Sequence, residues 1–314
     1  MTERPARALR RILAEPRCTI SVSAHDPLLA RLVERAGFEI VGLSGNAVAA
    51  AYLGLPDLGF LNLSDMASVA RRVAGAVSLP VLVDADTGYG NALAVLRTVR
   101  ELERAGAAGI VIEDQVASKK CAMIEAEHPV VPAEEHAAKI RAACAARSDP
   151  DFVIGARTDA AADLGLDEAI RRGFLYAEAG ADLLNIQVAG LPQEIERIGR
   201  AGLPVPLMAS MDEGKPMSLN PLSLLASAGY RIASFPGVVR YTVVRAVREN
   251  LAYLREHQST VGIRDRMATV EEYFAAVDLD RFLELEQKLL GPLRGEARRA
   301  GPVNPAFSKK PSGA

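Results

Sequence analysis

Eight short runs of continuous apolar residues recur along the chain, and longer amphipathic stretches separate most of them. Strands that are buried on both faces of a parallel sheet have this continuous apolar character, because neither face meets water. The predicted strands are Thr19–Val22, Ile40–Leu43, Pro80–Val83, Gly109–Ile112, Phe152–Ala156, Asp182–Ile186, Val205–Ala209 and Arg231–Phe235. The predicted helices between them include Pro27–Ala36, Leu93–Ala105, Ala133–Ala146, Leu166–Ala179 and Leu191–Ala201.

Several of the predicted helices end in Ala-Gly, at Gly37, Gly106, Gly180 and Gly202. A glycine after the last helical turn is typical of a helix that stops in a positive-φ conformation. Eight strand–helix units over this length predict an α/β fold, a closed (β/α)8 TIM-type barrel. The absence of GxGxxG after the first strand argues against an open dinucleotide-binding sheet.

Beyond the eighth strand the pattern predicts a helix over Val238–Glu256 and a helical tail around Val270–Leu290. This C-terminal extension is either an extra helix packed on its own barrel or an arm that embraces a neighbouring subunit, and the pattern leaves both open. We expect residues 1–300 to form one domain, including an arm over about residues 240–292. Residues 301–314 are rich in Pro, Ser and Lys, which predicts a disordered tail.

The composition is that of a globular protein with a sizeable core, since 49% of the 314 residues are hydrophobic and 24% are charged. A formal net charge of −2 and the absence of Trp argue against a nucleic-acid partner. No apolar run is long enough to span a bilayer, and the basic start MTERPARALRR lacks the apolar stretch of a signal peptide. Three widely spaced cysteines, Cys18, Cys121 and Cys144, predict a reducing, cytoplasmic location.

Acidic residues gather at the carboxyl ends of the third and fourth predicted strands, where Asp84, Asp86 and Glu113 lie. In a barrel these ends converge on one mouth, which is where active sites form. Oxygen ligands of this kind suit Mg²⁺, with Mn²⁺ as an alternative. Any one acid could instead be a helix cap or a solvated loop charge, but three at adjacent strand ends favour a metal site.

Two further segments could contact a substrate at this mouth. Ser44, Gly45 and Asn46 follow the second strand and could bind a carboxylate through a helix start, although on spacing alone an ordinary strand-to-helix turn explains them better. Asp57 follows a proline and could simply begin a turn.

The segment after the fourth strand, residues 115–132, is long and polar for a loop in a barrel. Loops of this kind often close over a site. Its Lys119 and Lys120 precede Cys121, where adjacent ammonium groups favour a thiolate and attract an anion. The alternative is an exposed loop with an incidental cysteine. The four histidines lack metal-ligand spacing, which argues against zinc.

The segments SGNAVAAAYLGLPDLGF, LPVLVDADTGYGN, AGAAGIVIEDQ, KKC, ARTDA, GLDEAI and EAGADLL occur in this order. Over roughly residues 19–260 the chain thereby resembles the isocitrate lyase/phosphoenolpyruvate mutase superfamily. It is most similar to the short members, which include 2-methylisocitrate lyases, 2,3-dimethylmalate lyases and carboxyphosphonoenolpyruvate mutases. The resemblance implies a (β/α)8 barrel whose last helix is swapped between paired subunits, in a homotetrameric dimer of dimers.

The resemblance also implies roles for individual residues. It implies Asp86 as the direct Mg²⁺ ligand and Asp84 and Glu113 as residues that hold the ion's waters. It implies Cys121 as the general acid of the lyase branch, since the Asn-Ser pair of the mutase branch is absent. With Cys121, the implied catalytic residues are Lys120 and Arg157. The implied substrate-binding residues are Ser44, Gly45, Asn46, Asp57, Arg157, Gln187, Ser210 and Arg240.

The sequence departs from the family pattern at several of these positions. Ala122 and Met123 follow Cys121, where the lyases usually carry Gly-His. Gln187 and Ser210 stand where a glutamate and an asparagine are typical, which removes a charge near the metal. Gly42 stands where several relatives carry a tyrosine or histidine.

The prediction is therefore a Mg²⁺-dependent carbon–carbon lyase. It would cleave a substituted malate or methylisocitrate-like 2-hydroxy dicarboxylate to a pyruvate-like keto acid and a second carboxylic acid. The alternatives are an oxaloacetate decarboxylase, a phosphonate mutase or hydrolase of the same superfamily, and a non-catalytic barrel that only binds ligand. The expected partner is a small carboxylate substrate, with no nucleic acid and no membrane.

Overall fold

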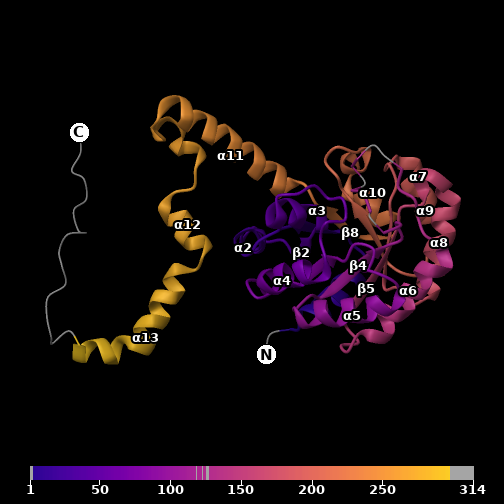
Figure 1. The fold of residues 1–314 in the computed structure, drawn as a ribbon, viewed down its shortest axis with the longest axis horizontal. Helices are drawn as coiled ribbons and strands as arrows, with labels where there is room; N and C mark the ends of the chain where they lie inside the picture. Colours follow the sequence, from indigo (N-terminus) through magenta and orange to yellow (C-terminus); the bar gives the residue numbers. More distant parts are fainter. Residues whose placement is uncertain (1–2, 118, 122, 125–126, 298–314) are drawn as a thin grey trace. The chain divides into compact units, whose positions relative to one another are not determined.

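Eight parallel strands close into a barrel in the order β1 to β8 (Figure 1). The computed structural model describes residues 3–297 except 118, 122, 125 and 126. The strands are β1 (Thr19–Ser23), β2 (Ile40–Leu43), β3 (Val81–Asp84), β4 (Gly109–Glu113), β5 (Val153–Thr158), β6 (Leu183–Ile186), β7 (Leu207–Ser210) and β8 (Tyr230–Phe235). All eight predicted strands and the (β/α)8 fold class are confirmed, with bounds that shift by at most two residues.

Helices surround the barrel and most of them cover the outer faces of its strands, whereas the helix over Val238–His257 has no buried residue (Figure 1). Those predicted are α2 (Pro27–Arg35), α5 (Ala92–Arg104), α6 (Ala133–Ala146), α8 (Leu166–Glu178), α9 (Pro192–Arg200) and α11 (Val238–His257). Those not predicted are α1 (Pro5–Ala14), α3 (Gly45–Val48), η1 (Ala49–Leu53), α4 (Leu63–Ala74), α7 (Ala161–Leu164), η2 (Pro216–Leu219) and α10 (Leu222–Ser227). Side-chain caps start several of them, as where Asp26 Oδ1 accepts a hydrogen bond of 2.8 Å from the Leu29 amide.

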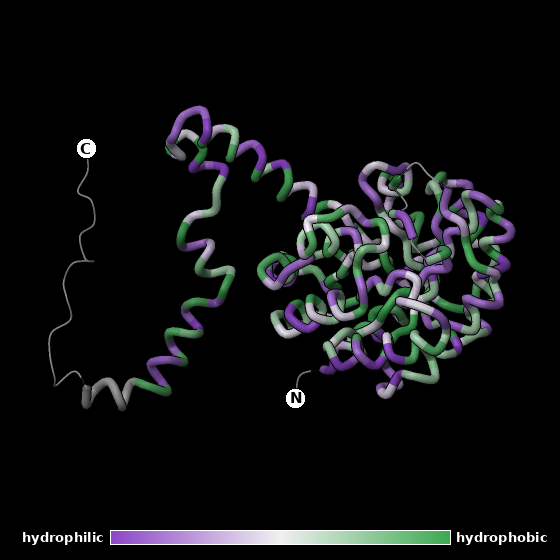
Figure 2. Tube along the Cα trace, viewed as in Figure 1, coloured by the Kyte–Doolittle hydropathy of each residue, from purple (hydrophilic) through white to green (hydrophobic). Residues whose placement is uncertain are grey.

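The interior of the barrel has a polar end and an apolar end. At the amino ends of the strands, Leu9, Ile12 and Leu13 of α1 form a buried cluster with strand residues such as Ile40 and Val153. A larger buried cluster combines residues of the strands and of the surrounding helices, and Figure 2 shows hydrophobic positions along both. Helix α1 therefore closes the end of the barrel opposite the mouth, and the apolar side chains there leave only the other end open to polar chemistry.

The chain divides into two compact units, one ending at Arg255 and one beginning at Glu256. The second unit contains η3 (Val261–Arg266), α12 (Val270–Ala276) and α13 (Leu279–Ala297). A capping box at Thr269 starts α12, and Asp278, at φ 57°, separates α12 from α13. The single domain over residues 1–300 therefore remains a prediction, and the predicted disorder of 301–314 lies outside the described residues.

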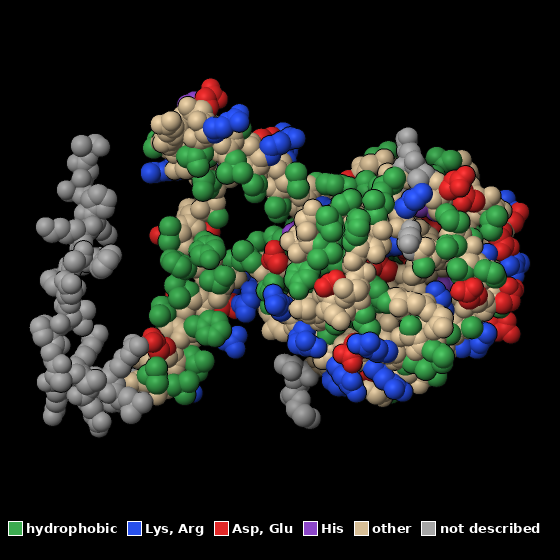
Figure 3. Space-filling model, in the orientation of Figure 1, with side chains coloured by type: hydrophobic (Ala, Val, Ile, Leu, Met, Phe, Trp, Pro, Cys, Tyr) green, Lys and Arg blue, Asp and Glu red, His purple; other side chains and the backbone are tan. Residues whose placement is uncertain are grey.

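The second unit exposes many large apolar side chains (Figure 3). They are Val261, Met267, Val270, Tyr273, Phe274, Phe282, Leu283, Leu285, Leu289 and Leu290. A surface this apolar is typical of an interaction site. Within the described part of the chain, no helix has the length and apolar character needed to cross a membrane.

Candidate active site

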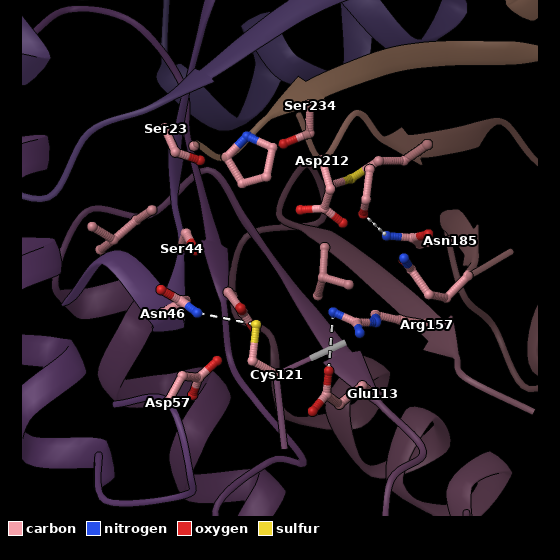
Figure 4. Close-up of a pocket in the computed structure, with 18 of the residues that line it drawn as sticks. Ser23, Ser44, Asn46, Asp57, Glu113, Cys121, Arg157, Asn185, Asp212 and Ser234 are labelled. Atoms are coloured by element: carbon pink, nitrogen blue, oxygen red, sulfur yellow. Dashed lines mark hydrogen bonds and ion pairs between the residues drawn. The ribbon is translucent and has the colours of Figure 1, made fainter. Parts of the chain in front are cut away.

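A pocket opens at the carboxyl ends of the strands and collects most of the predicted site residues (Figure 4). The predicted residues that line it are Ser44, Asn46, Asp57, Asp84, Glu113, Lys120, Cys121, Arg157, Gln187, Ser210 and Arg240. Gly45 and Asp86 adjoin it, since the Gly45 amide and the Asp86 amide both donate to Asp84, at 3.1 and 3.0 Å. The barrel thus brings to one mouth residues that are up to 196 positions apart in the sequence, from Ser44 to Arg240.

Three carboxylates converge on one side of this mouth around the ammonium of Lys119. Lys119 Nζ contacts Asp86 Oδ1, lies 3.3 Å from Asp57 Oδ2 and lies 3.9 Å from Glu113 Oε1. All of these side chains are buried, with 7% exposure or less. Asp86 adopts the left-handed conformation at φ 48°, which among non-glycine residues Asp and Asn adopt most readily.

Burial and unequal charge balance shift the pKa values in this cluster. Burial raises the pKa of Glu113 to about 8 and that of Asp86 to about 6, against the opposing pull of Lys119. Burial also acts on Asp84, but Lys119, Arg157 and two backbone amides lower its pKa below the usual range. Burial alone would lower the pKa of Lys119, but the surrounding carboxylates raise it well above the usual value. Glu113 and Asp86 therefore hold a proton more readily than ordinary carboxylates, whereas Asp84 stays ionised.

The chemistry of the cluster fits a hard divalent cation. Its donors are carboxylate oxygens, the ligands that Mg²⁺ and Mn²⁺ prefer. Asp86 Oδ1 and both carboxylate oxygens of Glu113 are buried, and within the described part of the chain their contacts are ion pairs with Lys119 and Arg157 rather than hydrogen bonds. Across residues 3–297 with their gaps, no three His, Cys, Asp or Glu side chains converge closely enough to hold an ion, and the Lys119 ammonium lies among the carboxylates. The assignment of Asp84, Asp86 and Glu113 to the metal stays a prediction.

Arg157 connects the acid cluster to the carboxyl end of β5. Its guanidinium donates to both oxygens of Asp159, at 2.9 and 2.7 Å, and lies 3.1 Å from Glu113 Oε2. Asp159 in turn is fixed through its amide, which donates to Asp114 Oδ1 at 3.0 Å. Burial alone would lower the pKa of Arg157, but Asp159 and Glu113 raise it well above the usual value. A permanently charged, oriented guanidinium of this kind can bind a substrate carboxylate at the mouth.

Cys121 lies at the mouth beside the second strand. Its Sγ accepts a hydrogen bond of 3.0 Å from Asn46 Nδ2, and its amide donates to the Asp57 carbonyl at 3.2 Å (Figure 4). The two lysines that precede it lie differently, since Lys119 points into the acid cluster and Lys120 is exposed at the rim. The sequence indicated two equivalent ammonium groups beside the thiol, and it did not indicate that Lys119 neutralises the carboxylates.

The Ser44–Asn46 turn serves the acid cluster as well as the pocket. Ser44 is the N-cap of α3, and the Gly45 amide donates to Asp84 rather than pointing freely at the mouth. Of the groups predicted to bind a substrate carboxylate at this turn, the Gly45 amide is therefore already bonded to Asp84. The Ser44 side chain still lines the pocket.

The opposite wall comes from β6, β7 and α11. Asn185 Nδ2 donates to Ser210 Oγ at 3.0 Å, and Gln187 lies at the same wall. Arg240 contacts the Met123 sulfur at 3.4 Å and the Tyr241 hydroxyl at 3.1 Å, and its Nε is buried without a hydrogen bond to any described residue. A cation with an unpaired buried donor fits an anionic ligand.

Several lining residues were not predicted. They are Ser21, Ser23, Asn185, Asp212 and Ser234. Ser21 and Ser23 alternate in SVS of the first strand, which places both on one face. That alternation was the available signal, but the sequence alone does not say that this face points into the barrel.

A barrel with converging buried acids, an arginine and a thiol at the carboxyl ends of its strands defines a class, the (β/α)8-barrel enzymes that act at this mouth. The phosphoenolpyruvate phosphomutase family matches residues 9–254. The chain therefore belongs to this family, within the isocitrate lyase/phosphoenolpyruvate mutase superfamily of lyases and mutases.

Individual relatives agree with this membership. The chain is 44% identical over 288 residues to the probable 2-methylisocitrate lyase 2 of Corynebacterium glutamicum, covering 92% of each chain. It is 38% identical over 281 residues to the 2,3-dimethylmalate lyase of Eubacterium barkeri, covering 90% of this chain and 96% of the relative. A crystal structure of phosphonopyruvate hydrolase in complex with oxalate and Mg²⁺ matches with a TM-score of 0.82 and 34% identity, covering 92% of this chain and all of the other.

Proposed function

We propose that the protein is a Mg²⁺-dependent carbon–carbon lyase. It cleaves a substituted malate or methylisocitrate-like 2-hydroxy dicarboxylate to a pyruvate-like keto acid and a second carboxylic acid. The observation that carries the proposal is the Cys121 thiol, held by Asn46 at 3.0 Å and lining the same pocket as Asp84 and Glu113. The lyases of C. glutamicum and E. barkeri support the reaction class.

The acid cluster would bind the reacting end of the substrate. Asp84, Asp86 and Glu113 would hold a Mg²⁺ or Mn²⁺ ion, with Asp57 beside it. When bound, the ion supplies Lewis-acid stabilisation for the negative charge that develops on a substrate oxygen. The Mg²⁺ present in the phosphonopyruvate hydrolase structure supports this choice of metal.

The remaining residues would bind and orient the two carboxylates. Arg157 pairs with the carboxylate of the pyruvate-like end, where Ser44, Gly45 and Asn46 also contribute. Gln187, Ser210 and Arg240 line the far wall and hold the second carboxylate. Lys120 at the rim attracts the dianionic substrate.

The chemistry requires one proton to leave the substrate and another to return. A base takes the proton of the 2-hydroxyl group, the carbon–carbon bond breaks, and its electron pair moves to the departing carbon. Cys121 Sγ then gives a proton to that carbon. The hydrogen bond from Asn46 Nδ2 orients the thiol for this transfer.

The test is a Cys121→Ser variant with Cys18→Ser as its matched control. Cys18 is a half-buried thiol outside the pocket, where burial raises its pKa to about 11. We expect turnover of a substituted malate to fall by about 100-fold or more in Cys121→Ser, as for loss of a general acid, and to stay unchanged in Cys18→Ser. Calorimetry should give the same affinity for Mg²⁺ and pyruvate in both. Unchanged turnover in Cys121→Ser would remove the thiol from the mechanism.

A second candidate is oxaloacetate decarboxylation, or phosphonate mutase or hydrolase chemistry. The neutral amide of Gln187 at the far wall and the likeness to phosphonopyruvate hydrolase favour it. Incubation with Mg²⁺ and a panel of malates, oxaloacetate and phosphonopyruvate separates the two, because each substrate gives a different product by NMR.

The proposal extends to assembly and location. We place the enzyme in the cytoplasm as a homo-oligomer, a dimer of dimers in which the C-terminal helices are exchanged, with no nucleic acid or membrane as partner. The exposed apolar side chains of α12 and α13 support such an exchange, because a surface of this kind is stable only when covered.

A further inference from the structure

Four small residues form a continuous patch on three neighbouring strands at the mouth. Ser21 and Ser23 of β1 pair in register with Ser234 of β8 and Gly42 of β2, respectively. All four line the pocket, and none carries a charge. We call these residues, Ser21, Ser23, Gly42 and Ser234, the serine patch.

The serines of the patch are removed from water, and the hydroxyl group of one of them has no partner. Ser21, Ser23 and Ser234 are 1%, 4% and 8% exposed. Ser21 Oγ is buried with no hydrogen-bond partner among the described residues. A buried hydroxyl without a partner is unfavourable, so the patch is suited to a ligand that supplies one.

The glycine of the patch makes room for that ligand. A Cβ on Gly42 would lie 2.8 Å from Ser23 Oγ and 3.3 Å from Ser21 Oγ. The serine hydroxyls thus border the Gly42 backbone directly, and any larger side chain at this position would displace them. The absence of a side chain keeps the hydroxyl groups accessible from the pocket.

The patch lies away from the predicted metal-binding end. In Figure 4, Ser23 and Ser234 occupy one side of the pocket, and Asp57 and Glu113 occupy the other. A substrate anchored at the acid cluster would therefore direct a substituent toward the serine patch.

We propose that the serine patch is a specificity subsite for an uncharged, hydroxyl-bearing substituent on the substrate, an inference that rests on the proposed lyase function. Hydroxyl groups can donate to and accept from one another, so such a substituent satisfies the buried serines. An alkyl substituent leaves Ser21 Oγ unpaired, and a carboxylate would lose its hydration beside serines that carry no positive charge. Sites built to hydrogen-bond a hydroxyl discriminate strongly against the analogue that lacks it.

The experiment compares three malates that differ only at carbon 3, namely hydroxymethyl, ethyl and carboxymethyl. The hydroxymethyl and ethyl groups have nearly the same shape. We expect kcat/KM with Mg²⁺ to be at least about 10-fold higher for hydroxymethyl than for either of the others. A ratio of one or less against either competitor would overturn the inference.

A binding measurement separates this inference from the proposed function. The dissociation constants of the same three compounds are measured by calorimetry with Mg²⁺ and the Cys121→Ser variant, which keeps the patch. If no compound is cleaved by the native enzyme, the lyase function fails, and the order of the three constants still decides the specificity of the patch.

Single substitutions in the serine patch show which of its residues contact the substituent. Ser21→Ala, Ser23→Ala and Ser234→Ala should each reduce the hydroxymethyl-to-ethyl ratio by about 3-fold or more, as for loss of one hydrogen bond. Gly42→Ala should reduce it by crowding Ser23 Oγ. Ser223→Ala, at an exposed position of α10, is the control and should leave the ratio unchanged. If the hydroxymethyl-to-ethyl ratio of all three patch serine variants equals that of the native enzyme, the patch does not contact the substituent.

Discussion

At the scale of single residues, Lys119 and Lys120 show how far two neighbouring, identical side chains can differ. Lys119 is 5% exposed and contacts carboxylates from three other segments, whereas Lys120 is exposed at the rim. A buried ammonium among carboxylates stabilises the folded chain mainly by preventing the uncompensated charges that its removal would leave.

We predict that Lys119→Gln destabilises the metal-free protein by about 3 kcal/mol, because it leaves buried carboxylates without their cation. Added Mg²⁺ should recover much of this loss, since binding to the native state alone raises stability. Thermal unfolding with EDTA and with Mg²⁺ measures both effects. Lys120→Gln, the matched control, should change stability by less than about 0.5 kcal/mol. Equal losses for Lys119→Gln in both buffers would argue against a shared site for the ammonium and the ion.

The sequence predicted the acids of this site but not the position of Lys119. Asp84, Asp86 and Glu113 follow strands, and strand ends can be read from apolar runs. Lys119 lies in a loop whose path depends on contacts with Asp57 and Asp86, which come from distant segments. Ser234 was missed for a related reason, because its pairing with Ser21 exists only once the barrel closes.

The burial of His136 predicts how the stability of the fold depends on pH. It is fully buried against Tyr176 with ring centroids 4.6 Å apart, and burial lowers its pKa from 6.5 to about 3. Between these values the unfolded chain binds a proton that the native chain does not, so stability falls as the pH drops below 6.5. We expect this residue to contribute a slope of about 1.4 kcal/mol per pH unit.

The measurement is chemical unfolding of the native protein and of His136→Phe between pH 4.5 and 7.5. The difference between their free energies of unfolding should be constant above pH 7 and should move in favour of the variant as the pH falls. Parallel curves over the whole range would contradict a neutral, buried His136.

At the scale of elements, Asp114 joins β4, β5 and α8 behind the site. Its Oδ2 accepts hydrogen bonds from Thr158 Oγ1 at 2.7 Å, Tyr176 Oη at 2.8 Å and Arg172 Nη1 at 2.9 Å. Its Oδ1 accepts from the Asp159 amide. Through this one carboxylate, the packing of α8 fixes the end of the strand that presents Arg157.

We predict that Asp114→Asn lowers the free energy of unfolding by about 3 kcal/mol, because it removes one of the two carboxylates that pair with the buried Arg172 guanidinium, and the one that remains, Glu168, is partly exposed. Tyr176→Phe should cost only about 1 kcal/mol, since it removes a neutral donor. Asp167→Asn changes an exposed acid on the same helix and should leave the free energy of unfolding nearly unchanged. Denaturant titrations rank the three variants, and an Asp114→Asn effect as small as that of Asp167→Asn would refute the role.

Elements were predicted well where a periodic pattern was sufficient. All eight strands and the helices α2, α5, α6, α8 and α9 follow from apolar periodicity. Helix α1 was missed although its sequence, PARALRRILA, places Leu9, Ile12 and Leu13 at helical spacing, because the sequence does not say that this face closes the barrel. Its helical state depends on tertiary contacts rather than on propensity.

At the scale of the whole molecule, the first unit forms a complete barrel, whereas the second has few buried residues of its own. Of its described large apolar side chains, Ile263 is buried, while Phe282 and Leu289 are 51% and 63% exposed. Short helices with so little buried surface are marginal by themselves in water. This is the physical basis for the proposed exchange between subunits.

We predict that Phe282→Asp together with Leu289→Asp lowers the oligomeric state, because charges cannot be buried unpaired in an apolar interface. Light scattering after size exclusion should show a smaller species than for the native chain. Leu93→Asp changes an exposed leucine of α5 in the same way and is the control. An unchanged mass for the double variant would show that these helices do not hold the subunits together.

The left-handed conformation of Asp86 affects how its contribution can be measured. At φ 48°, aspartate and asparagine are tolerated far better than alanine, which lacks a polar side chain able to bond the local backbone. Alanine at this position removes the charge and also strains the turn that carries the neighbouring Asp84. Only asparagine separates the two effects, so an alanine scan would overstate how much of the activity depends on this single charge.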